Sequence, residues 1–260
     1  MTTSVVTGAS AGIGAAFARA LAARGDDLVL VARSRARLDD LAAALIRDHG
    51  VGVEVLPADL TDAADLARVE ARVGDRARPV DLLVNNAGFG TAGSFDALPV
   101  EREDEEVRLN VLAVVRLTHA ALDGMTTRGD GAIVNVSSVA GYQPNPGMAT
   151  YGATKAFVSS FTQAVHEEVR SRGVHVMLVC PGFTRTDFQE RAGVDQSDVP
   201  GFAWMEPDRV VADALRALDA RRAVCVPGAL NRVAAVMSDV APAGVTRRVA
   251  GLVLRRSARH

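Results

Sequence analysis

Short apolar runs, mostly rich in β-branched residues, alternate along the chain with longer stretches of helical character. The seven runs lie at residues 5–6, 28–31, 53–56, 82–84, 133–136, 174–179 and 223–226. Strands of parallel sheets are buried on both faces, so they are apolar throughout rather than alternating with polar residues. The pattern therefore predicts one α/β domain with a doubly wound, seven-stranded parallel sheet and helices on both faces.

One predicted helix is unusually long and begins with acidic residues. Residues 100–125 have helical spacing and open with Glu101, Glu103, Asp104, Glu105 and Glu106. Negative side chains are favourable at a helix N-terminus because of the helix dipole. We interpret this acidic run as a solvated helix start.

After Gly228 the pattern changes to two short amphipathic segments rich in arginine. We therefore divide the chain into a domain at 1–228 and a helical extension at 229–260 that packs on the same domain or forms an oligomer contact. Contact of this extension with a membrane surface is a disfavoured alternative.

Composition limits the classes of function. The chain has 260 residues, 48% of them hydrophobic, and a formal net charge of -2, so it can bury a large core and has no basic field suited to nucleic acid. Two cysteines are too few for a disulfide framework, and no secretory signal or apolar stretch of about 18 residues is present. We expect a reduced, cytoplasmic protein without a transmembrane segment, whose partners are small molecules or protein chains.

A glycine-rich loop follows the first apolar run. Gly8, Gly12 and Gly14 lie between a predicted strand and a predicted helix, the arrangement in which backbone N–H groups and the helix dipole bind a pyrophosphate. Residues 8–12 also match Gly-x-Ser-x-Gly, in which Ser10 would be the nucleophile of a hydrolase. That alternative lacks a histidine in a recognisable position, and no histidine spacing indicates a metal site.

Arg33 stands at the end of the second predicted strand, where an acidic residue would bind the ribose of NAD. A guanidinium binds a 2′-phosphate and a carboxylate repels one, so we expect NADP(H) rather than NAD(H). Asp59, at the end of the third strand, is placed to meet the adenine.

Three polar residues indicate a catalytic site. Tyr151 and Lys155 are four apart and share a helix face, while Ser138 follows the fifth strand at the ligand-binding edge of the sheet. Lys155 is the only lysine, against 28 arginines, which suggests that its position requires a compact ammonium. The adjacent ammonium and a cationic cofactor ring would lower the phenol pKa from about 10 towards neutrality.

These residues resemble the short-chain dehydrogenase/reductase family, whose fold is Rossmann-like. The resemblance spans about residues 3–228. Its motifs are Thr7-Gly8-x-x-x-Gly12-Ile13-Gly14, Asn85-Asn86-Ala87-Gly88, Asn110, Ser138, Tyr151-x-x-x-Lys155 and Pro181-Gly182. One departure is Ala11, where many NADP-preferring members have a basic residue.

The resemblance implies hydride transfer between a nicotinamide and a carbonyl or alcohol. Tyr151 would be the general acid or base, Ser138 would hold the substrate oxygen, Lys155 would bind the nicotinamide ribose, and Asn110 would anchor a water relay. The implied cofactor-binding set is Gly8, Ser10, Gly12, Ile13, Gly14, Arg33, Asp59, Leu60, Asn85, Asn86, Ala87, Gly88, Tyr151, Lys155, Pro181, Gly182, Thr184 and Thr186.

The expected protein is an NADP(H)-dependent oxidoreductase that interconverts a hydrophobic ketone or acyl carbonyl and a secondary alcohol. Residues 183–207 would form a mobile substrate lid with large apolar side chains. The family's usual assembly implies a homodimer or homotetramer, with Phe157 and Phe161 as an apolar contact ridge. A nonenzymatic NADPH-binding regulator is the remaining alternative.

Overall fold

Seven parallel strands form the centre of the molecule in the computed structural model, which describes residues 2–193 and 200–240. The strands are β1 Thr3–Thr7, β2 Asp27–Ala32, β3 Val53–Pro57, β4 Leu82–Asn85, β5 Gly131–Val136, β6 Val174–Val179 and β7 Val224–Cys225. They pair in parallel in the order β3-β2-β1-β4-β5-β6-β7. The predicted seven-stranded, doubly wound sheet is confirmed.

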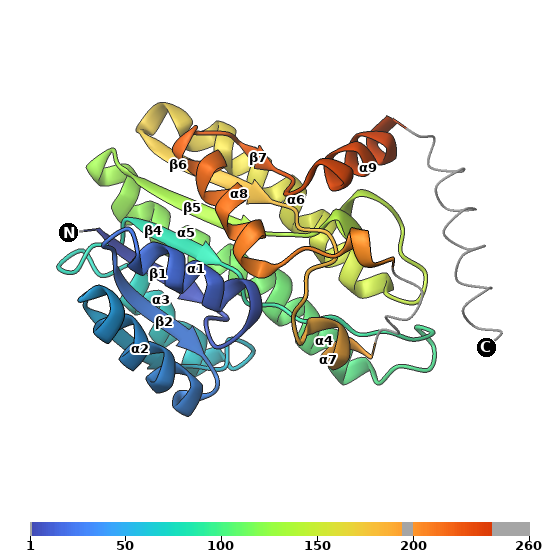
Figure 1. The fold of residues 1–260 in the computed structure, drawn as a ribbon, viewed down its shortest axis with the longest axis horizontal. Helices are drawn as coiled ribbons and strands as arrows, with labels where there is room; N and C mark the ends of the chain where they lie inside the picture. Colours follow the sequence, from blue (N-terminus) through green and yellow to red (C-terminus); the bar gives the residue numbers. More distant parts are fainter. Residues whose placement is uncertain (1, 194–199, 241–260) are drawn as a thin grey trace.

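Helices connect the strands and cover the sheet (Figure 1). They are α1 Gly12–Ala22, α2 Arg35–His49, α3 Ala63–Val73, α4 Val100–Val107, α5 Ala113–Arg128, α6 Ala149–Val169, α7 Phe188–Ala192, α8 Pro207–Asp219 and α9 Ala229–Val240. Helices α1, α2 and α8 pack against one face of the sheet and form one apolar layer with it. Helices α3, α5 and α6 form the second layer on the other face. Burial on both faces explains why β2, β4 and β6 are apolar almost throughout.

The single helix expected at residues 100–125 is interrupted. A π-helical turn, Arg108–Leu112, joins α4 to α5 without a break in the chain direction. The turn carries Asn110, which is fully buried. Hydrogen bonds of Asn110 to segments outside the helix favour the wider turn, and such tertiary contacts leave no periodic signal in the sequence.

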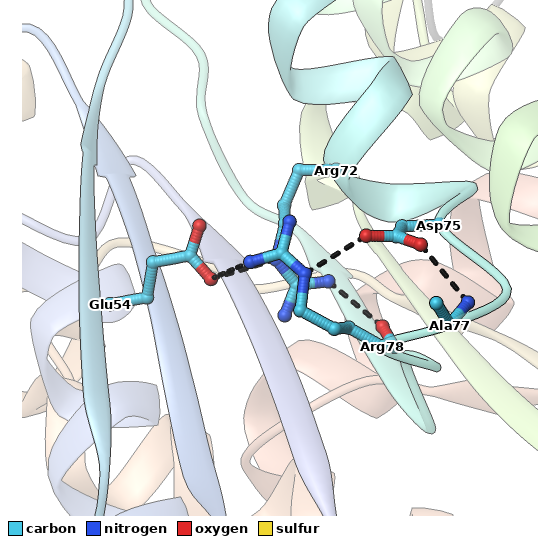
Figure 2. Close-up of polar contacts among 5 residues, drawn as sticks. All are labelled: Glu54, Arg72, Asp75, Ala77 and Arg78. Carbon is cyan, nitrogen blue, oxygen red and sulfur yellow. Dashed lines mark hydrogen bonds and ion pairs between the residues drawn. The ribbon is translucent and has the colours of Figure 1, made fainter.

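The edge strand β3 is secured by an arginine of α3 (Figure 2). Arg72, only 8% exposed, donates from Nε to Glu54 Oε2 at 2.8 Å and from Nη1 to the Arg78 carbonyl at 3.0 Å. Arg78 in turn pairs with Asp75 at 2.9 Å and with Glu54 at 3.4 Å. The cluster therefore connects β3, α3 and the loop that leads to β4.

Helix α9 begins the predicted C-terminal extension and extends away from the sheet in Figure 1. Most of the extension's arginines fall at 241–260, outside the described residues. Within the described part of the chain, no helix has the length and apolarity needed to cross a bilayer.

Candidate active site

A cleft of about 930 Å³ lies at the carboxyl ends of the strands, between the segments that follow β1 to β6. Most of the predicted site residues meet there. Those that line it are Gly8, Ser10, Gly12, Ile13, Arg33, Asp59, Leu60, Asn86, Ala87, Gly88, Ser138, Tyr151, Lys155, Pro181, Gly182, Thr184 and Thr186. Gly14, Asn85 and Asn110 lie behind the cleft wall.

The glycine loop is a tight backbone turn in that wall. Gly8 and Gly12 have φ of 67° and 54°, the left-handed region that strains residues with a Cβ. A Cβ at Gly14 would lie 2.2 Å from the Gly8 carbonyl oxygen, so α1 touches the loop directly. Helix α1 begins with no side-chain cap on its N–H groups and no acid in its first turn. Its N-terminus therefore suits an anionic ligand.

Two arginines line the cleft beyond β2. Arg33 follows the strand directly, and Arg37 lies in the first turn of α2. The Ser34 hydroxyl caps this helix by accepting from the Arg37 backbone N–H at 3.4 Å. Arg37 is not among the residues predicted from the sequence, although its place three residues after a capping serine and four after Arg33 is a readable signal.

Asp59 and Leu60 line the same region, after β3. The Asp59 carboxylate accepts from the N–H and the hydroxyl of Thr61, at 3.0 and 2.7 Å. Asp59 thus stabilises its own turn as well as facing the cleft.

Asn85 and Asn86 are neighbours in sequence with different surroundings. Asn86 donates from Nδ2 to the Thr7 carbonyl at 2.9 Å and supports the glycine loop. Asn85 is only 2% exposed and donates to Asn135 Oδ1 at 2.9 Å and to Thr118 Oγ1 at 3.2 Å. The structure therefore gives Asn85 a supporting position between sheet and helix, away from the cleft surface, rather than the expected cofactor contact.

Tyr151 and Lys155 lie one helical turn apart on α6 and both face the cleft. Lys155 Nζ is 5.7 Å from the centre of the Tyr151 ring and donates to the Val136 carbonyl at 3.1 Å. Ser137 donates to the Lys155 carbonyl at 2.7 Å. This bond ties the end of β5 to α6, which holds the neighbouring Ser138 opposite Tyr151.

Asn110 lies next to Lys155 but behind the wall. Its Nδ2 donates to the Phe89 carbonyl at 2.8 Å and to Thr154 Oγ1 at 3.1 Å. A Cβ added to Gly88 would lie 2.9 Å from Asn110 Oδ1 and 3.4 Å from Lys155 Nζ. The two side chains therefore flank Gly88, where only a glycine leaves them room.

The acidic start of α4 is only partly solvated, and the interpretation from sequence was wrong for two residues. Glu101 and Asp104 are exposed, but Glu103 is 6% exposed and Glu106 is fully buried. Glu106 lies one helical turn before Asn110 and Glu103 nearly one turn earlier, so all three share the inward face. The helix-dipole rule failed because this face packs against the loop after β4 and against α6.

Burial dominates the titration of the two central side chains. It raises the pKa of Tyr151 to about 12, with a smaller opposing effect from the hydrogen bond to Ser138. Burial lowers the pKa of Lys155 to about 8, opposed by the negative charge of Glu106. The expected lowering of the phenol pKa is therefore absent when only the residues of the chain act, and Tyr151 is held as a neutral phenol.

The hydrolase alternative for Ser10 finds no support in the cleft. A serine nucleophile needs a histidine base within hydrogen-bond reach. Among the described residues, no histidine lines the cleft that contains Ser10. His166 and His175 instead contact each other between α6 and β6, with ring centres 5.6 Å apart.

Comparison with known proteins agrees with this geometry. The family model described as short chain dehydrogenase matches residues 2–197. A short-chain dehydrogenase from Sphingobium yanoikuyae in complex with NADPH is 43% identical, with a TM-score of 0.85 over 94% of this chain and 97% of that one. The bulky-bulky ketone specific alcohol dehydrogenase from Comamonas testosteroni is 36% identical, with a TM-score of 0.80 over 94% of this chain and 96% of that one.

A very-long-chain 3-oxoacyl-CoA reductase from Anas platyrhynchos is 36% identical over 186 residues, which are 70% of this chain. The match spans 59% of that reductase, so the chain covers less than two thirds of its length. The family model nevertheless covers well over half of the chain. The fold and the cleft residues of the chain also agree with the family motifs found in its sequence. The chain belongs to the short-chain dehydrogenase family.

Proposed function

We propose that the protein is an NADP(H)-dependent carbonyl reductase or alcohol dehydrogenase, with Tyr151 as the general acid in reduction and the general base in oxidation. The observation that carries this proposal is the meeting of Ser138, Tyr151 and Lys155 in a cleft that also contains Arg33 and the glycine loop. A charged dinucleotide and a carbonyl substrate both find complementary groups there.

The cleft fits a dinucleotide bearing a 2′-phosphate. The uncapped N-terminus of α1 suits the pyrophosphate, and the two guanidinium groups of Arg33 and Arg37 suit a phosphate on the ribose. Thr186 lies against the glycine loop, since a Cβ at Gly12 would be 2.9 Å from its Cγ2. A bound nicotinamide would supply or accept the hydride. The NADPH in the Sphingobium yanoikuyae complex is consistent with this choice.

The chain's own residues would manage the proton and the substrate oxygen. Tyr151, as a neutral phenol, can donate its proton to a carbonyl oxygen that becomes negative, and Ser138 can donate a second hydrogen bond to that oxygen. Lys155 can hold ribose hydroxyls with its ammonium and Asn110 can fix the helix turn beside it. Residues on two sides of the cleft would thus stabilise the same developing charge.

The cleft also has large apolar side chains in its lining. Phe89, Met148, Phe183 and Phe188 line it, and the Phe188 ring lies 5.2 Å from the Tyr151 ring. Part of the expected lid, 194–199, lies outside the described residues. A hydrophobic ketone or acyl substrate suits this lining, in agreement with the bulky-ketone and 3-oxoacyl-CoA specificities named for two relatives.

The test is NADPH oxidation with a panel of bulky aryl ketones and 3-oxoacyl thioesters, measured for wild type and Tyr151→Phe. Loss of the phenol proton should lower kcat by about 10²–10⁴-fold, while binding of NADPH, measured by calorimetry, should persist. Undiminished turnover in Tyr151→Phe would refute the assigned role. Binding of NADPH without turnover of any carbonyl by wild type would favour the nonenzymatic regulator.

Self-association through α5 and α6 is part of the same proposal. Phe157 is 44% exposed and stacks on Phe161 with ring centres 5.9 Å apart, and Leu112 is equally exposed. An exposed aromatic side chain held against a half-buried one is typical of a protein interface. Light scattering of wild type and Phe157→Glu would decide, since the glutamate should convert a dimer or tetramer to smaller species.

A further inference from the structure

Two carboxyl groups of α4 are buried beside the candidate active site, and the proposed reaction does not use them. Glu103 is 6% exposed and Glu106 is fully buried, and both face Thr91 in the loop after β4. Glu106 Oε1 has no hydrogen-bond partner among the described residues. Burying a carboxylate so poorly partnered is costly, which suggests a role beyond stability.

The geometry at Thr91 indicates that the pair shares a proton. The Thr91 hydroxyl oxygen lies 2.6 Å from Glu103 Oε1 and 2.8 Å from Glu106 Oε2, and the Thr91 backbone N–H donates to the same Glu106 oxygen at 3.0 Å. A hydroxyl has one proton and can donate it fully to only one of two carboxylates. Both short contacts are good hydrogen bonds when one carboxyl is protonated and donates to Thr91. The cluster then carries one negative charge instead of two.

The groups that influence the charge of Glu106 come from three segments. Glu103 lies on the same helix, Thr91 donates from the loop, and Lys155 acts through its charge from α6, which packs against α4. Burial raises the pKa of Glu106 to about 7, and Glu103 adds to this increase, whereas Thr91 and Lys155 oppose it. In return, the negative charge of Glu106 raises the pKa of both Lys155 and Tyr151.

We infer that Glu106, coupled to Glu103 through Thr91, is a positioning residue whose negative charge holds Lys155 as an ammonium and Tyr151 as a neutral phenol. Ionisation of the cluster releases one proton to solvent and leaves this charge on the inward face of α4, which packs against the helix that carries Tyr151 and Lys155. The negative charge raises the pKa of both side chains, so Lys155 and Tyr151 keep their protons up to a higher pH. The catalytic consequence rests on the proposed function, but the charge coupling does not.

The single lysine permits a direct test. Protein labelled with [13Cε]lysine gives one Cε resonance, which reports the ionisation of Lys155 without substrate or cofactor. In wild type this resonance should show a main step near pH 8 and a minor one near pH 7 from Glu106. In Glu106→Gln the minor step should vanish, and the pKa of Lys155 should fall by about 0.5 to 1.

Glu101→Gln is the matched control, because Glu101 is an exposed acid of the same helix. In this variant the Lys155 resonance should titrate as in wild type.

The pH profile of kcat/KM for ketone reduction gives the catalytic readout. The alkaline limb should move to lower pH in Glu106→Gln and stay in place in Glu101→Gln. An unchanged Lys155 titration in Glu106→Gln would overturn the inference. Loss of reductase activity in every assay, with the Lys155 shift intact, would instead overturn the proposed function alone.

Discussion

Arg33 and Arg37 are the residues on which the cofactor preference depends in the proposed function. Each guanidinium can make charge-assisted hydrogen bonds to a 2′-phosphate, and such bonds contribute about 1.5–3 kcal/mol. We therefore expect Arg33→Ala and Arg37→Ala each to raise the KM for NADPH by about ten- to hundredfold. The KM for NADH, which lacks the phosphate, should change by less than about twofold.

Steady-state kinetics with both dinucleotides checks this expectation. Arg35→Ala is the matched control, because Arg35 is exposed in the same turn of α2 but does not line the cleft. Equal increases of KM for NADPH and NADH in the Arg33 variant would show that this arginine does not read the 2′-phosphate.

For single residues, the sequence predicted the site positions that motif spacing determines, but not the positions that depend on packing. Ser138, Tyr151 and Lys155 were found because their spacing reflects one helix face and one strand end, and the structure brings them together. Glu106 was misread as solvated, since helix-dipole reasoning considers only the helix itself. Its position four residues before Asn110 was the available signal, because those two residues share a face.

Arg72 is the element-scale link between β3 and α3, and its removal should destabilise the fold. Arg72→Ala leaves the Arg78 carbonyl without its donor and removes the ion pair between the buried Arg72 and the partly exposed Glu54. We expect a loss of about 1–3 kcal/mol in the free energy of unfolding. Binding of NADPH should be unaffected under native conditions, because none of these residues lines the cleft.

Urea unfolding followed by circular dichroism measures this loss. Arg76→Ala provides the comparison, since Arg76 pairs with Asp123 on the surface, where both side chains are 61% exposed. Exposed pairs contribute at most about 1 kcal/mol. If the two variants lost the same stability, the contacts of the buried Arg72 would contribute no more than a surface pair.

All seven strands were predictable from short apolar runs, and in β2, β4 and β6 these runs reflect burial on both faces of the sheet. The helix at 100–125 was predictable in extent but not in detail. The π-helical turn at Asn110 depends on hydrogen bonds to Phe89 and Thr154, which lie far from it in the sequence. Local propensity carries no record of such bonds, so the displacement of Asn110 behind the cleft wall could not be predicted.

For the whole molecule, two buried groups make opposing contributions to the pH dependence of stability. Burial raises the pKa of Glu106 from 4.5 to about 7, so the folded state loses stability as pH rises through this window. Burial lowers the pKa of His175 from 6.5 to about 4, so the folded state gains stability as pH rises from about 4 to 6.5. Each contribution is up to about 3 kcal/mol, at about 1.4 kcal/mol per pH unit.

These contributions largely cancel between pH 4.5 and 6.5 in wild type, and single variants should separate them. Relative to wild type, the unfolding free energy of Glu106→Gln should increase with pH from about 4.5 to 7, and that of His175→Gln should decrease from about 4 to 6.5. Urea unfolding at intervals of half a pH unit measures both differences, with His119→Gln as an exposed control. A pH-independent difference for Glu106→Gln would mean that this carboxyl ionises equally in the folded and unfolded chains. In that case burial would not raise the pKa of Glu106, and this carboxyl would not contribute to the pH dependence of stability.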